Sequence, residues 1–198
     1  MTRLIFIRHA ATDCVPSRLA GRDANVHLNA AGKVQGQRLA RSLKQLGIGK
    51  IYSSPQPRAR ETAEFLAELS GETVTIAPQL DEIDYGEWSG QSFDDLRGIA
   101  QWRDFNSLRS CTRIPGGELM IEVQARVLAL MEILSRRHPA TTVCAGQSCR
   151  RYPRRAGALF GHAARSCASA RSQSGIDQHR CHAAVWAAGS LHQQHGRN

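Results

Sequence analysis

The sequence has no long apolar run and few aromatic residues, and these two absences exclude several classes of protein. No stretch approaches the roughly 18 apolar residues of a membrane span, and the apolar part of MTRLIFIRHA is too short for a signal peptide. We therefore expect a cytoplasmic protein with no membrane partner. Without an export signal, the six cysteines are expected to be reduced thiols rather than a disulfide scaffold.

Lysine is absent and acidic residues are nearly absent after residue 143. Residues 144–198 carry eight Arg and one acid, Asp177, whereas residues 1–143 carry 18 Lys and Arg against 16 Asp and Glu. Most of the formal net charge of +9 therefore belongs to an Arg-rich tail, and the remainder has the balanced charge of an ordinary enzyme. Because the tail has few aromatic residues for base stacking, we expect no nucleic-acid partner.

Apolar strands alternate with amphipathic helices through residues 1–143, a length that suits one substantial domain. The expected elements are strand 3–9, helix 29–45, strand 50–54, a helix opening at Pro57, strand 72–77, an exposed loop at 78–90, a short helix at 93–105, and a helix on Val123, Val127, Leu130 and Leu134 that ends near His138. This alternation predicts a three-layer α/β/α domain with a mainly parallel sheet. Ligands of such sheets bind at the carboxyl ends of the strands.

Polar residues follow the first two predicted strands. Arg8 and His9 end the first, and Ser53-Ser54 with Arg58 follow the second. A neutral imidazole can attack phosphorus and hold the phosphoryl group, while guanidinium groups fork onto the phosphate oxygens. These residues predict phosphoryl transfer with His9 as the nucleophile and Arg58 as a second phosphate ligand beside Arg8.

Four acids lie in the loop that follows the third predicted strand: Asp81, Glu82, Asp84 and Glu87. A carboxylic acid beside a bound phosphate can protonate the leaving oxygen. Glu82 is our candidate for this proton donor. Each of the other three remains an alternative, since the group could equally be a solvated acidic surface.

Several motifs together resemble the histidine phosphatase superfamily, which includes the cofactor-dependent phosphoglycerate mutases. They are IRHAATD (7–13), Leu28-Asn29 with Gly32 and Gln35, SSPQPRARETA (53–63), LDEIDYGEWSG (80–90) and PGGE (115–118). The last two look most like the small phosphatase branch that contains α-ribazole phosphatases. The resemblance covers about residues 2–143.

The resemblance implies a phosphoglycerate mutase-like fold and a phosphomonoesterase that acts through a phosphohistidine on a small phosphorylated metabolite. His9 would be the phosphoacceptor, Glu82 the proton donor, and Arg8 and Arg58 the phosphate ligands. Thr12 and Gly21 are the predicted substrate-binding residues. No metal and no cofactor is implied. Phosphoglycerate mutase-type transfer is the alternative reaction.

Two departures from the family pattern stand out. Ala10 occupies a position where the family usually has glycine, and its methyl group could crowd the approaching phosphate. The second histidine of the family, expected at the end of a later strand in a Ser/Thr-His-Gly context, is missing. After TTV (141–143), the segment CAGQSCRRYPRR has neither strand nor helix periodicity, so we expect it to contribute nothing to a hydrophobic core. An inactive or phospho-ligand-binding remnant is therefore a further alternative.

We hypothesise that the tail, 144–198, is translated one nucleotide out of register. Read one base later, the codons spanning Gly146 to Arg150 permit valine-serine-histidine-alanine, and the histidine falls across Ser148-Cys149. The nucleotide sequence near codon 144 tests this hypothesis. Residues 1–143 would then be an incomplete histidine-phosphatase-like domain.

Two rival chemistries fit the tail poorly. Cys149 and Arg155 have the spacing of cysteine-based phosphatases, but the residues between them include Pro153 and lack the glycine that a phosphate-wrapping loop favours. Cys181 and His182, although adjacent, have no paired partner at zinc-site spacing.

Overall fold

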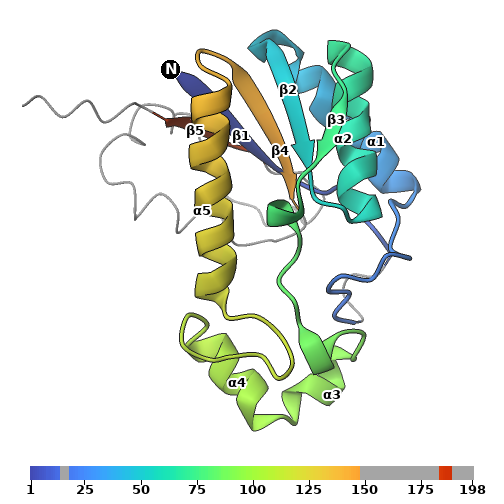
Figure 1. Ribbon diagram of the computed structural model, residues 1–198. Coiled ribbons are helices and arrows are strands. Elements are labelled where there is room, and N and C mark those ends of the chain that lie inside the picture. Colours follow the sequence, from blue (N-terminus) through green and yellow to red (C-terminus); the bar gives the residue numbers. More distant parts are fainter. Residues whose placement is uncertain (14–17, 148–182, 189–198) are drawn as a thin grey trace, which may run out of the picture.

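The computed structural model describes residues 1–13, 18–147 and 183–188 as a three-layer α/β/α arrangement (Figure 1). Its central sheet has the strand order β3-β2-β4-β1-β5. The strands are β1 (Thr2–Arg8), β2 (Ile48–Ser53), β3 (Val74–Ile76), β4 (Thr142–Gln147) and β5 (Ala183–Ala188). The first four are parallel, and β5 joins the edge antiparallel to β1. The predicted fold class, a mainly parallel sheet between helices, is confirmed.

The helices cover the two faces of the sheet unequally. They are α1 (Ala30–Leu43), α2 (Pro57–Ser70), α3 (Phe93–Arg97), α4 (Ala100–Ser107) and α5 (Met120–Arg137). Figure 1 shows α5 alone along one face, α1 and α2 together on the other, and α3 and α4 beyond the carboxyl ends of the strands. Each helix therefore needs one apolar face, whereas the central strands are covered on both faces.

Alternation along β1 distributes its side chains between the two cores. Leu4 and Phe6 pack in the core beneath α5, whereas Ile5 and Ile7 pack in the core beneath α1 and α2. All four are at most 6% exposed. A strand buried on both faces reads as a continuous apolar run, which explains why β1 has no polar alternation.

The elements follow the sequence expectations closely, with two local differences. The expected helix at 93–105 divides at Gly98 into α3 and α4. The exposed loop at 78–90 contains two short 3-10 turns, at Pro78–Leu80 and Gly86–Trp88. Trp88 and Leu80 are buried, so this loop is fixed to the domain rather than free in solvent.

The sequence predicts that the core-forming segment ends at residue 143. The strand that begins in TTV (141–143) extends beyond this residue. It continues to Gln147 as β4, between β1 and β2, with Cys144 and Ala145 each 1% exposed. The central position of β4 provides paired strands on both sides, which offsets the weak strand propensity of small residues. The predicted boundary at 143 thus lies within β4.

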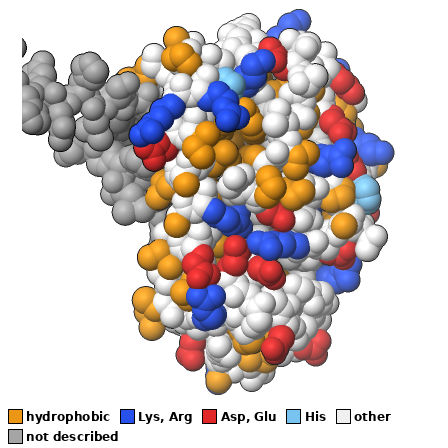
Figure 2. All heavy atoms as spheres, viewed as in Figure 1, with side chains coloured by type: hydrophobic (Ala, Val, Ile, Leu, Met, Phe, Trp, Pro, Cys, Tyr) orange, Lys and Arg blue, Asp and Glu red, His pale blue; other side chains and the backbone are white. Residues whose placement is uncertain are grey.

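No helix of the described residues is long and apolar enough to cross a membrane. On the face shown in Figure 2, acidic and basic side chains are interspersed rather than gathered by sign. This agrees with the near balance of charge in residues 1–143.

Candidate active site

The parallel strands β1, β4 and β2 have their carboxyl ends side by side. Arg8 of β1 is in register with Gln147 of β4, and Ser53 of β2 is in register with Gly146. The backbone continues this arrangement for one more residue on each side, because the His9 N–H donates to the Gln147 carbonyl at 3.1 Å and the Ser54 N–H donates to the Gly146 carbonyl at 2.8 Å. The two polar segments predicted from the sequence therefore flank the end of β4.

The His9 ring is oriented by its own backbone. Its Nδ1 lies 2.7 Å from the Ala10 carbonyl oxygen. A carbonyl oxygen can only accept, so Nδ1 carries the proton, and in the neutral ring the lone pair is on Nε2. This assigns Nε2 as the atom that can act as a nucleophile.

The backbone after His9 is held by α1 and α2. The Ala10 N–H donates to Thr62 Oγ1 at 3.0 Å, and the Ala11 N–H donates to Gln35 Oε1 at 3.0 Å. Gly32 in the first turn of α1 permits this approach, since a Cβ there would lie 2.1 Å from the Ala11 carbonyl oxygen. The turn carrying His9 is thus fixed from two directions.

Arg58, at 2% exposure, lies in the first turn of α2 and reaches the segment that follows His9. Its Nη2 donates to the Gly21 carbonyl at 2.7 Å, and its Nη1 donates to the Asp23 carbonyl at 3.4 Å. Gly21 has a φ of +53°, a conformation that favours glycine. The backbone of Arg58 is linked to the His9 turn through Thr62, whose Oγ1 donates to the Arg58 carbonyl at 2.7 Å and accepts from the Ala10 N–H at 3.0 Å.

Asp81 joins the loop after β2 to the loop after β3. Its Oδ1 accepts from Ser54 Oγ at 3.1 Å, from Gln56 Nε2 at 2.8 Å and from the Glu82 N–H at 2.8 Å. Glu82, the candidate proton donor, is half-buried, and its Oε1 accepts from the Ile83 N–H at 3.0 Å. Glu82 is therefore tied through Asp81 to the strand end that precedes Arg58.

The other acids of the loop have structural contacts of their own. Asp84 accepts from the Gly86 N–H at 2.9 Å and pairs with Arg22 at 3.1 Å. Glu87 is exposed. Asp81 and Asp84 therefore both have structural contacts, and Glu82 as the proton donor stays a prediction.

The other predicted site residues, Arg8, Thr12 and Gly21, differ in burial and in contacts. Arg8 is half-buried at the last register position of β1. Thr12 is 7% exposed and follows the fixed turn, whereas Gly21 contributes its carbonyl to Arg58 rather than an open surface. Ala10 is buried, and only Ala140 among the described non-glycine residues has a positive φ, so position 10 does not need the conformational freedom of glycine.

The family model for the histidine phosphatase superfamily (branch 1) matches residues 4–150. The chain belongs to the histidine phosphatase superfamily. A relative named as a probable phosphoglycerate mutase, from Escherichia fergusonii, is 32% identical over 131 residues, which is 64% of this chain and 60% of that protein. Phosphoserine phosphatase 1 from Hydrogenobacter thermophilus is 30% identical over 145 residues, 72% of this chain and 69% of that protein. Both matches leave a substantial part of each relative uncovered.

Solved structures of the superfamily have the same fold. A mycobacterial glucosyl-3-phosphoglycerate phosphatase matches with a TM-score of 0.67 and 28% identity, covering 74% of this chain and 73% of that chain. An Escherichia coli protein assigned as an α-ribazole-5′-phosphate phosphatase matches with a TM-score of 0.66 and 23% identity over 74% and 73% of the two chains, a likeness of fold.

The histidine phosphatase pattern predicts a second histidine just after β4. The described histidines are His9, His27 and His138, and neither of the last two follows this strand. Ser148-Cys149, where the shifted reading frame would encode histidine, lies outside the described residues, as does the Cys149–Arg155 motif. Burial raises the pKa of the Cys144 thiol, on β4 itself, to about 12, so this thiol is no substitute nucleophile.

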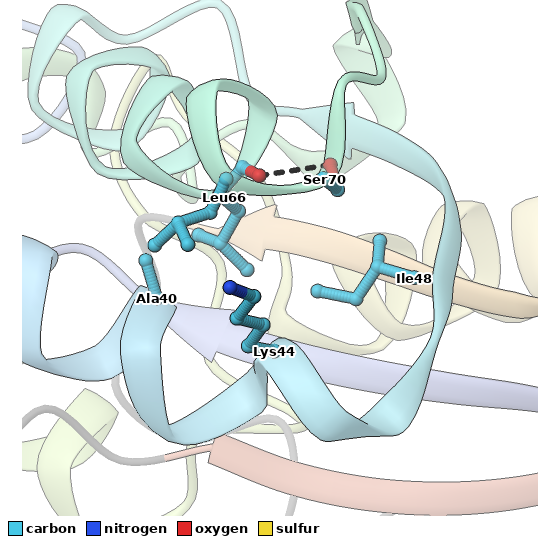
Figure 3. Close-up of a pocket in the computed structure, with 6 residues that line it drawn as sticks. Ala40, Lys44, Ile48, Leu66 and Ser70 are labelled. Atoms are coloured by element: carbon cyan, nitrogen blue, oxygen red, sulfur yellow. Dashed lines mark hydrogen bonds between the residues drawn. The ribbon is translucent and has the colours of Figure 1, made fainter.

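A small pocket lies apart from the candidate site. Figure 3 shows a pocket between α1, α2 and the start of β2, with the Lys44 side chain extending between Ala40, Ile48 and Leu66. Because Ile48 begins β2, the pocket lies at the opposite end of the strand from Ser53. Within the described ranges, no group of three or more His, Cys, Asp or Glu side chains is arranged to hold a metal ion.

Sequence reasoning missed the organising roles of Asp81 and Arg126. Asp81 appeared only as an alternative proton donor. Arg126, in α5, hydrogen-bonds to the carbonyls of the loop that carries Glu82. Its place between Val123 and Val127, which are both buried, was the available signal, because an arginine beside the apolar face of a helix lies close to the neighbouring element.

Proposed function

We propose that this chain is a phosphomonoesterase that transfers a phosphoryl group from a small phosphorylated metabolite to His9 and then to water. The observation that carries the proposal is the orientation of the His9 ring, whose Nδ1 faces the Ala10 carbonyl so that the lone pair is on Nε2. The backbone after His9 is linked through Thr62 to the turn of α2 that carries Arg58. Membership of the superfamily supports the same chemistry.

The proposed reaction has two steps. In the first, His9 Nε2 forms a bond to phosphorus, the ester P–O bond breaks, and Glu82 gives its proton to the leaving oxygen. In the second, water attacks phosphorus, its proton passes to the Glu82 carboxylate, and the N–P bond breaks to release phosphate. Arg8 and Arg58 would stabilise the negative charge on the transferring group.

The proposed substrate class rests on the relatives. Their names specify phosphoserine and glucosyl-3-phosphoglycerate, which are both small phosphate monoesters. The probable phosphoglycerate mutase among them makes transfer to a second metabolite hydroxyl the alternative to transfer to water.

A second candidate function is phosphate-ligand binding without turnover. The specific observation in its favour is that β4 ends beside His9 at Gln147, and the sequence continues with Ser148-Cys149, where the expected histidine is absent. If the tail is read out of register, the chain has lost this side chain, and His9 and Arg58 would form only part of the phosphate site.

Turnover of p-nitrophenyl phosphate by three proteins tests the proposal: this chain, its His9→Ala variant, and a version with the shifted frame restored after codon 144. We expect turnover by this chain that falls at least about 1,000-fold in His9→Ala, because the nucleophile is removed. Turnover by the frame-restored protein alone, with phosphate still bound by this chain, would establish the binding function instead. Turnover by this chain that survives in His9→Ala would reject the phosphohistidine.

A further inference from the structure

Arg126 lies in the middle of α5 and contacts the backbone of the loop that carries Glu82. Its Nη2 donates to the Asp81 carbonyl at 2.9 Å and to the Glu82 carbonyl at 3.1 Å, and its Nη1 donates to the Gln79 carbonyl at 2.5 Å. The Arg126 side chain is 19% exposed. Figure 1 shows this loop passing between the ends of the strands and α5.

Glu118 and Arg22 complete the arrangement around the loop. Glu118 pairs with Arg126 at 3.2 Å and with Arg22 at 2.9 Å, and it also accepts from the Asp84 N–H at 2.9 Å. Arg22 Nε donates to the Glu82 carbonyl at 2.9 Å. The backbone carbonyl of Glu82 therefore accepts from two guanidinium groups.

These contacts leave the loop little freedom to move. A loop backbone without regular secondary structure normally satisfies its carbonyls with water. Here the planar guanidinium of one residue of α5 donates to three carbonyls of the loop, those of Gln79, Asp81 and Glu82. A flexible ammonium group cannot reproduce this geometry. A displacement of about 1 Å in a reacting group can cost a hundredfold in rate.

We propose that Arg126 is a positioning residue, which fixes the loop backbone so that the Glu82 carboxyl group stays within reach of the leaving oxygen. The proposal rests on the proposed function, because it assigns Glu82 as the proton donor. It predicts that loss of the Arg126 guanidinium impairs protonation of the leaving group more than attack by His9.

Arg126→Met tests the proposal, because it keeps the aliphatic stem and removes the donors. Arg136→Met is the matched control: Arg136 is on the same helix, its side chain is 80% exposed, and it pairs with Glu132 one turn earlier on the helix surface. Hydrogen exchange of the amides of residues 81–84 reports the position of the loop independently of activity. We expect exchange at least about tenfold faster in Arg126→Met and unchanged exchange in Arg136→Met.

Two substrates separate positioning from a general loss of folded protein. p-Nitrophenolate leaves without a proton, whereas the serine alkoxide of phosphoserine needs one. We expect kcat/KM for phosphoserine, which reports the step in which the leaving group departs, to fall at least about tenfold more than kcat/KM for p-nitrophenyl phosphate in Arg126→Met. Partial rescue is expected in Arg126→Lys, which retains a donor and the charge.

Equal losses on the two substrates, or unchanged exchange at residues 81–84, would overturn the proposal. If Arg126→Met does not fold, the same two comparisons are made with Arg126→Lys and decide it in the same way. If the unmodified chain turns over neither substrate, the proposed function has failed, and exchange alone then decides whether Arg126 fixes the loop.

Discussion

At the scale of single residues, the candidate site depends on side chains that orient other groups. One oxygen of Asp81 accepts from donors on two loops, and its other oxygen faces Arg22 at 3.6 Å. The Asp81 side chain is only 14% exposed, so water cannot easily replace it as the acceptor. Asp81 thus links the loop preceding Arg58 to the loop carrying Glu82.

We expect Asp81→Ala to lower the free energy of unfolding by about 2–3 kcal/mol, because Ser54, Gln56 and the Glu82 N–H lose their shared acceptor. Asp81→Asn is the matched variant, since its carbonyl oxygen can take the place of Oδ1. It should lose less than half as much. Urea unfolding of the three proteins measures the difference. Equal losses would mean that the negative charge beside Arg22, and not the acceptor, stabilises the fold.

At the scale of elements, α1 matters because its first turn supports the His9 loop. Asn29 is its N-cap, with Oδ1 accepting from the Gly32 N–H at 2.8 Å, and the Asn29 N–H donates to the Ala11 carbonyl at 3.1 Å. A cap at this position therefore stabilises the helix and orders the turn after His9.

Asn29→Ala should lower the free energy of unfolding by about 1 kcal/mol, the usual cost of losing a side-chain cap. Asn29→Ser, which retains a hydroxyl acceptor, should lose only a few tenths of that. The expected measurement is a lower urea midpoint with an unchanged m-value. Identical midpoints for the two variants would show that the Asn29 side chain does not act as the cap.

The elements that sequence analysis predicted well are those whose signals are local. Asn29 and Pro57 mark helix starts, and RLIFIR reads as a buried strand without reference to any partner. The end of β4 was missed because its small residues become a strand only between β1 and β2. The antiparallel pairing of β5 with β1 joins segments far apart in the sequence, which no periodicity reports.

The candidate site shows the same division between local signals, which the sequence reveals, and distant contacts, which it does not. His9 follows β1, Arg58 lies in the first turn of the helix after β2, and Glu82 lies in the loop after β3, so all three belong to connections at the carboxyl ends of parallel strands. Their mutual orientation depends on contacts such as Arg126 with the Glu82 carbonyl, which join α5 to a loop more than 40 residues earlier. Such a contact has no signal in composition or spacing.

At the scale of the whole molecule, the two ends of the sheet have different properties. The carboxyl ends carry the candidate site. At the amino ends, His138 closes α5, its carbonyl accepts from Thr2 Oγ1 at 2.8 Å, and its Nε2 lies 2.9 Å from the Tyr52 hydroxyl. Changes at this end should alter stability without a direct effect on the site.

The lowered pKa of His138 should make the stability of the protein depend on pH. Burial, followed by the charges of Arg137 and Lys50, lowers the pKa of His138 in the folded protein. The unfolded chain therefore takes up this proton at a higher pH than the folded chain does. It follows that the stabilising contribution is complete above pH about 6.5, the ordinary histidine value, and is lost as the pH falls toward the folded pKa.

We expect the free energy of unfolding to decrease between pH 7.5 and pH 5.5, and to decrease less in His138→Gln. The glutamine amide oxygen can still accept from Tyr52 but does not titrate, so the variant isolates the proton from the hydrogen bond. Urea unfolding at both pH values gives the comparison, because groups common to the two proteins cancel in the difference. A decrease in His138→Gln as large as that in the unmodified chain would place the pH dependence on other groups.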